Sequence, residues 1–155
     1  MTRARVGVTA AAILAAATVV WAQKPDFSGT WTLDPAGAPA ESGGGGPLGS
    51  GPATVRQTAD ALTIERTVDD STVILTYKLD GSDSRNTMAG RDGQSIDSMS
   101  TVRWQGPKLT IVTRLETGGQ IVQSTDVWTV EGSTLIVETT DARGTQKRIY
   151  KRSGQ

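Results

Sequence analysis

The chain has 155 residues with 16 basic and 16 acidic side chains, and it contains no histidine and no cysteine. This balance offers no basic patch for nucleic acid, and the fold must hold together without disulfides. The usual general base near neutral pH, the strongest nucleophile and the common zinc ligands are missing. We therefore expect no enzyme, no metal site, no cofactor and no nucleic-acid partner.

The first 22 residues have the three-part layout of a secretory signal peptide. Arg3 and Arg5 precede an apolar run at residues 6–20, and small residues flank a cut before Gln23. The run of about 15 residues is shorter than the roughly 20 that an anchoring helix needs. We expect export to the periplasm or the medium, a single mature domain at residues 23–155, and no stable membrane anchor after cleavage.

The first segment that resembles folded protein is Phe27–Asp34, which we predict to be a strand. It is followed by residues 36–52, which contain seven glycines and three prolines. Such a composition has little apolar surface to bury and a large conformational entropy to lose. We therefore expect a flexible loop over this segment.

From Ala53 onward, short runs rich in β-branched and aromatic residues alternate with turn residues at intervals of roughly 8 to 12 positions. Tight turns join most neighbouring runs, so consecutive strands should pair antiparallel. Residues 81–93 are expected to be a long polar connection. With the first strand, the pattern predicts about nine strands, at residues 27–34, 53–58, 61–68, 71–80, 95–104, 108–116, 120–131, 134–140 and 145–152.

A sheet of this size, with no helix to cover a face, must close on itself or split into two layers. The sequential turns favour an all-β, antiparallel up-and-down meander closed into a β-barrel of about 8–9 strands. A β-sandwich stays open as the alternative, because alternation alone does not separate the two architectures.

Both ends of the predicted domain resemble one group of proteins. FSGTW at residues 27–31 is similar to the Gly-x-Trp signature of the first strand in lipocalins and fatty-acid-binding proteins, the calycin group. KRIYK at residues 147–151 resembles the Arg-x-Tyr ending of the last strand in fatty-acid-binding proteins. The layout also resembles small exported bacterial proteins of unassigned function. The helical lid of fatty-acid-binding proteins is replaced here by the glycine-rich loop.

The resemblance implies a lipocalin-like β-barrel that binds a small, largely apolar ligand, with a carboxylate as one option for its polar group. A filled barrel that serves as a structural or protein-interaction module of the cell envelope is the alternative, because Thr-rich strands leave little apolar lining. A lipocalin-like hydrolase or isomerase is a minor alternative, for which Asp97 and Asp126 are one candidate carboxylate pair. The oligomeric state is left open.

The resemblance also suggests two interpretations of Arg148. In the first, Arg148 and Tyr150 share one strand face, point into a cavity and hold a ligand carboxylate. In the second, Arg148 lies across Trp31 and closes the barrel floor with Gly29 through a cation–π contact. We favour the second, because the last strand is rich in basic residues.

Trp104 and Trp128 lie near the ends of predicted strands, next to glycines. As structural residues they would be core or rim aromatics. As ligand-binding residues they would stack an apolar or sugar ring. The structural role is the simpler interpretation.

Overall fold

The computed structural model describes residues 24–38, 46–89 and 95–153. Within these ranges the chain forms one short 3-10 helix, η1 (Pro35–Gly37), and ten strands. No helix in the described ranges has the length and apolarity needed to cross a membrane. The strands are β1 (Gly29–Leu33), β2 (Ala53–Gln57), β3 (Ala61–Val68), β4 (Ser71–Lys78), β5 (Ser84–Ala89), β6 (Ser95–Gln105), β7 (Lys108–Thr117), β8 (Gln120–Glu131), β9 (Thr134–Asp141) and β10 (Gly144–Ser153).

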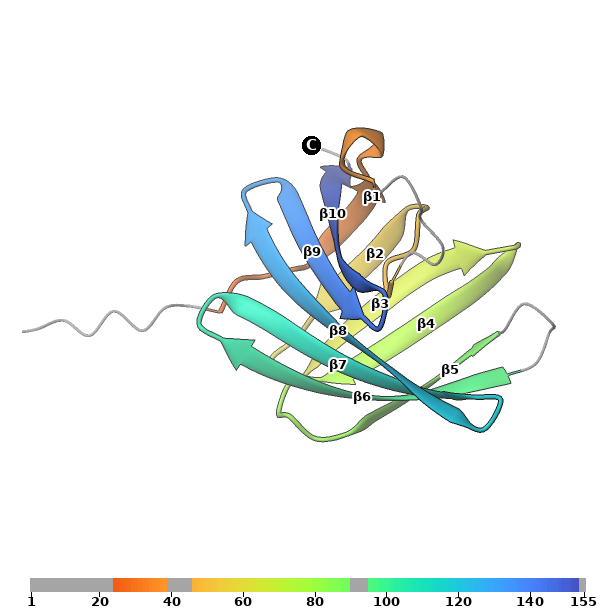
Figure 1. Ribbon diagram of the computed structural model, residues 1–155. Helices are drawn as coiled ribbons and strands as arrows, with labels where there is room; N and C mark the ends of the chain where they lie inside the picture. Colours follow the sequence, from red (N-terminus) through yellow and green to blue (C-terminus); the bar gives the residue numbers. More distant parts are fainter. Residues whose placement is uncertain (1–23, 39–45, 90–94, 154–155) are drawn as a thin grey trace, which may run out of the picture.

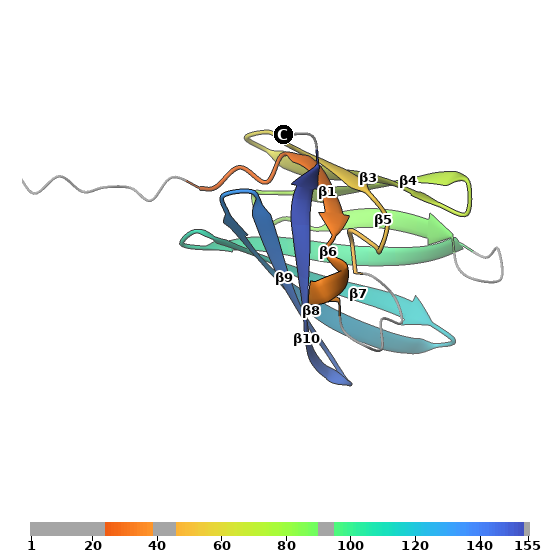
Figure 2. The same ribbon diagram turned by 90° about the horizontal axis from the view of Figure 1, so that it is seen from above.

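All ten described strands belong to one antiparallel sheet in the order β4-β3-β2-β1-β10-β9-β8-β7-β6-β5. Strands that pair in the sheet also follow one another in the chain, with one exception. Besides its chain neighbour β2, β1 pairs with β10, the last strand. The sheet curls into a nearly closed barrel (Figures 1 and 2). The predicted all-β meander and barrel are thus confirmed. The sandwich alternative is wrong, because a single continuous sheet contains every described strand.

The predicted count of 8–9 strands is too low, because β5 lies inside the segment that was expected to be a polar connection. Its sequence, SRNTMA, has no alternation of apolar and polar residues. Of the β5 side chains that the structure describes, residues 84–87, the buried ones are polar, namely Ser84 and Asn86. A search for apolar periodicity therefore could not detect this strand.

Polar side chains, in place of a backbone ladder, join β4 to β5, the two ends of the sheet order. The Thr76 N–H donates to Asn86 Oδ1 at 2.7 Å, and Asn86 Nδ2 donates to the Thr76 carbonyl at 3.1 Å. The Lys78 N–H donates to Ser84 Oγ at 2.8 Å. A buried backbone group without a partner costs about 1–3 kcal/mol. The polar residues of β5 thus complete the barrel where the ladder is interrupted.

Trp31 lies on β1, where the first strand pairs with the last. Its side chain is fully buried, and the Arg152 guanidinium lies over its ring, 4.5 Å from the ring centroid. The prediction that Arg148 stacks on Trp31 is therefore wrong. The register of β1 and β10 places Arg152 directly opposite Trp31, whereas Arg148 lies four residues earlier on the strand.

Gly29 leaves room for this contact. Its φ is +141°, and a Cβ at this position would lie 2.7 Å from Arg152 Nη1. The same Nη1 donates to the Ser28 carbonyl at 2.5 Å. Gly29, Trp31 and Arg152 therefore form one unit that holds the first strand to the last.

Part of the glycine-rich segment that was expected to be flexible packs against the barrel. Leu48 is 1% exposed and belongs to the hydrophobic core. The Tyr150 hydroxyl donates to the Gly49 carbonyl at 3.0 Å. Residues 39–45 of this segment lie outside the described residues, as does the signal peptide predicted at residues 1–22.

Replacing Asn86 by alanine should lower the free energy of unfolding by about 1–3 kcal/mol, because both backbone groups of Thr76 lose their partner. Urea unfolding measures the loss, and hydrogen exchange of the Thr76 amide should accelerate. Arg85→Ala changes the neighbouring exposed side chain of β5 and should stay within about 0.5 kcal/mol of the wild type. Equal losses in the two variants would contradict the bridging role.

The contact between Arg152 and Trp31 predicts that Trp31→Ala costs about 3–5 kcal/mol of stability and Arg152→Ala about 0.5–2 kcal/mol. Arg152→Ala should cost much less in a Trp31→Ala background, because the ring that it covers is then absent. Urea unfolding of the double-mutant cycle measures this coupling. Additive losses would show that the two side chains do not stabilise each other.

Candidate functional site

The inward-facing side chains divide the barrel interior into an apolar and a polar part. Aliphatic and aromatic residues from most strands form one core cluster with Trp31. Beside this cluster lies a group of buried polar residues, which is unusual for an interior because buried polar groups must find partners. Its buried members are Ser84, Asn86, Ser98, Ser100, Asp126 and Arg148.

Three neighbouring strands bring the charged members of this group together. Asp126 on β8 is paired with Thr139 on β9, and Thr139 is paired with Gln146 on β10. Arg148 lies two residues beyond Gln146, so both point to the same face of the sheet. Closure of the barrel makes that face the interior.

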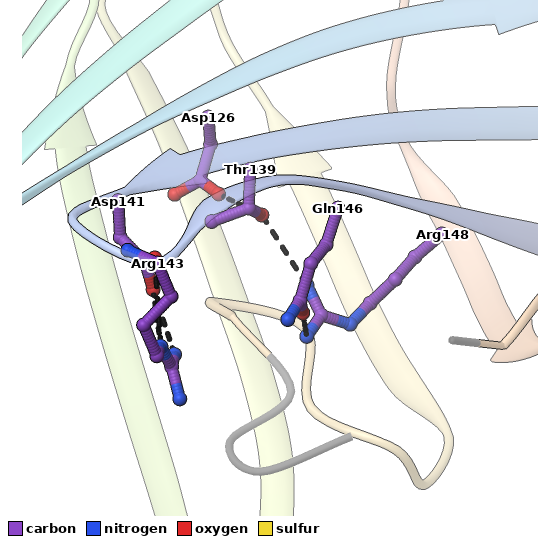
Figure 3. Close-up of polar contacts among 6 residues, drawn as sticks. All are labelled: Asp126, Thr139, Asp141, Arg143, Gln146 and Arg148. Atoms are coloured by element: carbon purple, nitrogen blue, oxygen red, sulfur yellow. Dashed lines mark hydrogen bonds and ion pairs between the residues drawn. The ribbon is translucent and has the colours of Figure 1, made fainter. Parts of the chain in front are cut away.

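The contacts form a chain from a cation to an anion (Figure 3). Arg148 is 2% exposed, and its Nη2 donates to Gln146 Oε1 at 2.9 Å. Arg148 Nη1 donates to Thr139 Oγ1 at 3.4 Å, and the Thr139 hydroxyl donates to Asp126 Oδ1 at 2.5 Å. One hydroxyl therefore links a buried guanidinium to a buried carboxylate.

Asp126 is the one carboxylate among the described residues that is buried. Burial raises the pKa of Asp126 to about 6, and the Thr139 hydrogen bond and the positive charge of Arg148 act in the opposite direction. Asp126 therefore changes its charge close to neutral pH. The Asp141–Arg143 pair drawn beside it in Figure 3 lies at the β9–β10 turn, where the Arg143 side chain is 67% exposed.

Two tyrosines and a second arginine extend the polar group. Burial raises the pKa of both Tyr77 and Tyr150, that of Tyr150 to about 12, so both hydroxyls stay protonated. Arg66 on β3 interacts electrostatically with both tyrosines, and partial burial lowers its own pKa. Among the described residues, this polar group thus contains two guanidinium groups, one carboxyl group and two phenol hydroxyls.

Arg66 also borders a depression of about 300 Å³ between residues 48–52 and 66–69. Gly49 in its wall has a φ of +70°, and a Cβ there would lie 2.5 Å from Arg66 Nη1. A glycine is therefore required where the chain passes over the guanidinium. Arg66 therefore borders this depression and also interacts electrostatically with the two buried tyrosines.

Of the residues predicted to bind a ligand, Arg148 and Tyr150 do lie in the interior. The Tyr150 hydroxyl is engaged with the Gly49 carbonyl, and contact of either residue with a ligand stays a prediction. The inward position of Arg148 agrees with the first of its two interpretations.

Trp104 and Trp128 both pack against Phe27. The Phe27 and Trp104 rings are stacked with centroids 6.0 Å apart, and the Trp128 ring meets Phe27 edge-on at 5.8 Å. Trp128 is fully buried, whereas Trp104 also borders a second depression of about 450 Å³. These contacts account for both rings as core aromatics, and their ligand-stacking role stays a prediction.

Asp97 and Asp126 do not form a carboxylate pair. Asp97 is exposed and accepts a hydrogen bond from Thr87, whereas Asp126 points inward. The sequence could have indicated that Asp126 points inward. It lies two residues before the buried Trp128, and residues two apart on a strand share one face. No group of three or more His, Cys, Asp or Glu side chains suited to a metal ion occurs in the described part of the chain.

No protein-family model and no curated protein matches this chain. Solved structures do resemble it. A point variant of the fluorescent protein UnaG matches with a TM-score of 0.56 and 22% identity, over 83% of this chain and 97% of that one. Human cRBP IV matches with the same TM-score and identity, over 83% of this chain and 99% of that one. At this identity the likeness shows the fold alone, a calycin-like barrel.

Asp126→Asn should stabilise the protein at neutral pH. The folded-state pKa of about 6 lies above the value of about 3.9 in an unfolded chain. The stability contributed by Asp126 is therefore fully present below about pH 4 and is lost as pH rises through about 6. The advantage of the variant should grow over this window by up to about 3 kcal/mol. Urea unfolding at a series of pH values measures it, and a difference independent of pH would contradict the assignment.

Proposed function

We propose that the chain is an exported binding barrel for a small, largely apolar molecule that carries a carboxylate. The observation that carries the proposal is the Arg148 guanidinium, 2% exposed within a barrel whose remaining interior is largely apolar. A guanidinium donates charge-assisted hydrogen bonds, and a carboxylate is the acceptor that its planar fork fits best.

The two parts of the interior suit the two parts of such a ligand. The apolar cluster accepts a hydrocarbon or ring system, and a few placed polar groups orient it. Arg66, which borders the depression beside residues 48–52, attracts the carboxylate, and Arg148 binds it further inside. The ligand then reaches Arg148 past Leu48 and Gly49, which line the depression, and the Gly49 carbonyl accepts a hydrogen bond from Tyr150.

A filled barrel that serves as an envelope scaffold is the second candidate. It is supported by Leu48, which takes up core space, and by the packing of Phe27 between two tryptophans. In this case the polar group would serve only to specify the fold. The proposed binding function and the scaffold differ in one respect that can be measured, namely occupancy of the interior.

Native mass spectrometry of the protein purified from its own host tests occupancy and export together. We expect a non-covalent adduct of an apolar acid on a chain that begins at Gln23. A chain that retains residues 1–22 would contradict export. A chain without an adduct that also fails to bind lauric acid would favour the scaffold.

Arg148→Gln should weaken lauric acid binding about 10- to 100-fold, because a charge-assisted hydrogen bond is worth about 1.5–3 kcal/mol. Quenching of tryptophan fluorescence measures the affinity. 1-Dodecanol, which has the same chain and no charge, should bind wild type and variant within about threefold of each other. Arg143→Gln, at the exposed β9–β10 turn, is the matched control. Equal losses for the acid and the alcohol would contradict the role of Arg148.

A further inference from the structure

Leu48 reaches the hydrophobic core from a loop and not from a strand. It is 1% exposed and belongs to the core cluster, yet it lies between η1 and β2, in the sequence GPLGSGP at residues 46–52. We call residues 46–52 the strap. Leu48 and Gly49 are buried, whereas the rest of the strap is exposed or half-buried. The strap therefore places one buried side chain in the barrel.

Few contacts hold the strap to the barrel. In the described part of the chain, one hydrogen bond joins the two, from the Tyr150 hydroxyl to the Gly49 carbonyl at 3.0 Å. The Gly49 N–H donates to the Gly46 carbonyl at 3.3 Å, which is a bond within the strap. Core residues on strands, by contrast, are held by backbone ladders to neighbouring strands. Leu48 is thus fixed by apolar packing and by a single hydrogen bond of its neighbour.

The strap covers the polar group as well as the core. A Cβ at Gly46 would lie 3.8 Å from Thr139 Oγ1 and 3.9 Å from Asp126 Oδ1, and Gly49 passes over the Arg66 guanidinium. Both glycines have a positive φ, +52° at Gly46 and +70° at Gly49, a region that glycine adopts at no steric cost. Movement of this one segment would therefore uncover apolar and charged side chains together.

The depression of about 300 Å³ lies beside the strap and ends on Leu48. Val68, which is 38% exposed, and Arg66 border it from β3. Arg66 Nε is buried and has no hydrogen-bond partner in the described part of the chain. An apolar surface and a cation with an unused donor are thus side by side at the place where the strap enters the core.

A hydrocarbon enters a close-packed interior only where a side chain can leave it. A strand residue leaves only when its backbone ladder breaks, whereas Leu48 leaves with the strap. We propose that the hydrocarbon part of a ligand binds in the place of Leu48, and that the strap moves off the barrel when it does. The inference rests on the proposed function and adds the position of the hydrocarbon part and the segment that controls access to it.

The strap and the ligand then compete for one position. The strap lowers the apparent affinity of every hydrocarbon ligand by the fraction of molecules in which Leu48 is out of the core. This competition depends on apolar contact, so it acts on lauric acid and on 1-dodecanol alike. It is therefore separable from the effect of the arginines, which acts on the acid.

The first test uses thiol labelling, because the chain contains no cysteine and Leu48→Cys introduces a unique thiol. Saturating lauric acid should accelerate the reaction of this thiol with a disulfide reagent by at least about tenfold, since the ligand favours the open strap. Leu62→Cys, at a fully buried position of β3, should stay slow with and without lauric acid. Equal acceleration in both variants would show general unfolding and would contradict the strap.

Hydrogen exchange of the unmodified protein gives the same information without a substitution. The amides of residues 48–51 should exchange faster when lauric acid is bound, whereas those of β3 should not. Unchanged or slower exchange in the strap, or unchanged labelling of Leu48→Cys, overturns the inference while binding itself survives.

The second test is affinity. Leu48→Ala should bind both lauric acid and 1-dodecanol about tenfold or more tightly than the wild type, because the strap no longer fills the position. Ile121→Ala truncates an aliphatic side chain that is 74% exposed on β8 and should leave both affinities unchanged. No gain in Leu48→Ala also overturns the inference. Absence of binding of both compounds, in the wild type and in Leu48→Ala, overturns the proposed function and the inference with it.

Discussion

The pairing of β1 with β10 is the constraint on which the rest of this structure depends. It joins segments near the two ends of the folded domain and turns a linear meander into a barrel. Trp31 and Arg152 hold that pairing from opposite strands, and Gly29 leaves the space that the guanidinium needs. Once the sheet is closed, every second residue of each strand must share one interior.

That shared interior explains why polar residues recur at fixed places. Where the backbone ladder stops between β4 and β5, Asn86 and Ser84 supply the missing hydrogen bonds. Where β8, β9 and β10 run side by side, alternation brings Asp126, Thr139 and Arg148 into one cluster. The first set completes the sheet. The second set contains opposite charges that are both buried, and burial costs each of them solvation free energy. We therefore propose a binding role for this set.

Most of the fold could be predicted from the sequence, because alternating apolar residues and glycine turns mark nine of the strands. Strand β5 could not be predicted, because its inward residues are polar and act through side-chain hydrogen bonds. The candidate site was harder to predict. Arg148 and Arg152 both belong to the basic last strand, and only the strand register decides which one covers Trp31. The alternation of buried and exposed residues on its strand places Asp126 on the inner face. Its link to Arg148 through Thr139, however, depends on the pairing of three strands.

The most direct test of a charged interior that binds acids is a crystal structure of the protein grown with lauric acid at about pH 6, near the midpoint expected for Asp126. The account predicts the ligand inside the barrel, its carboxylate within hydrogen-bonding distance of Arg148 and its hydrocarbon chain against the apolar cluster. An interior filled by the protein's own side chains, with lauric acid absent or on the outer surface, would contradict it.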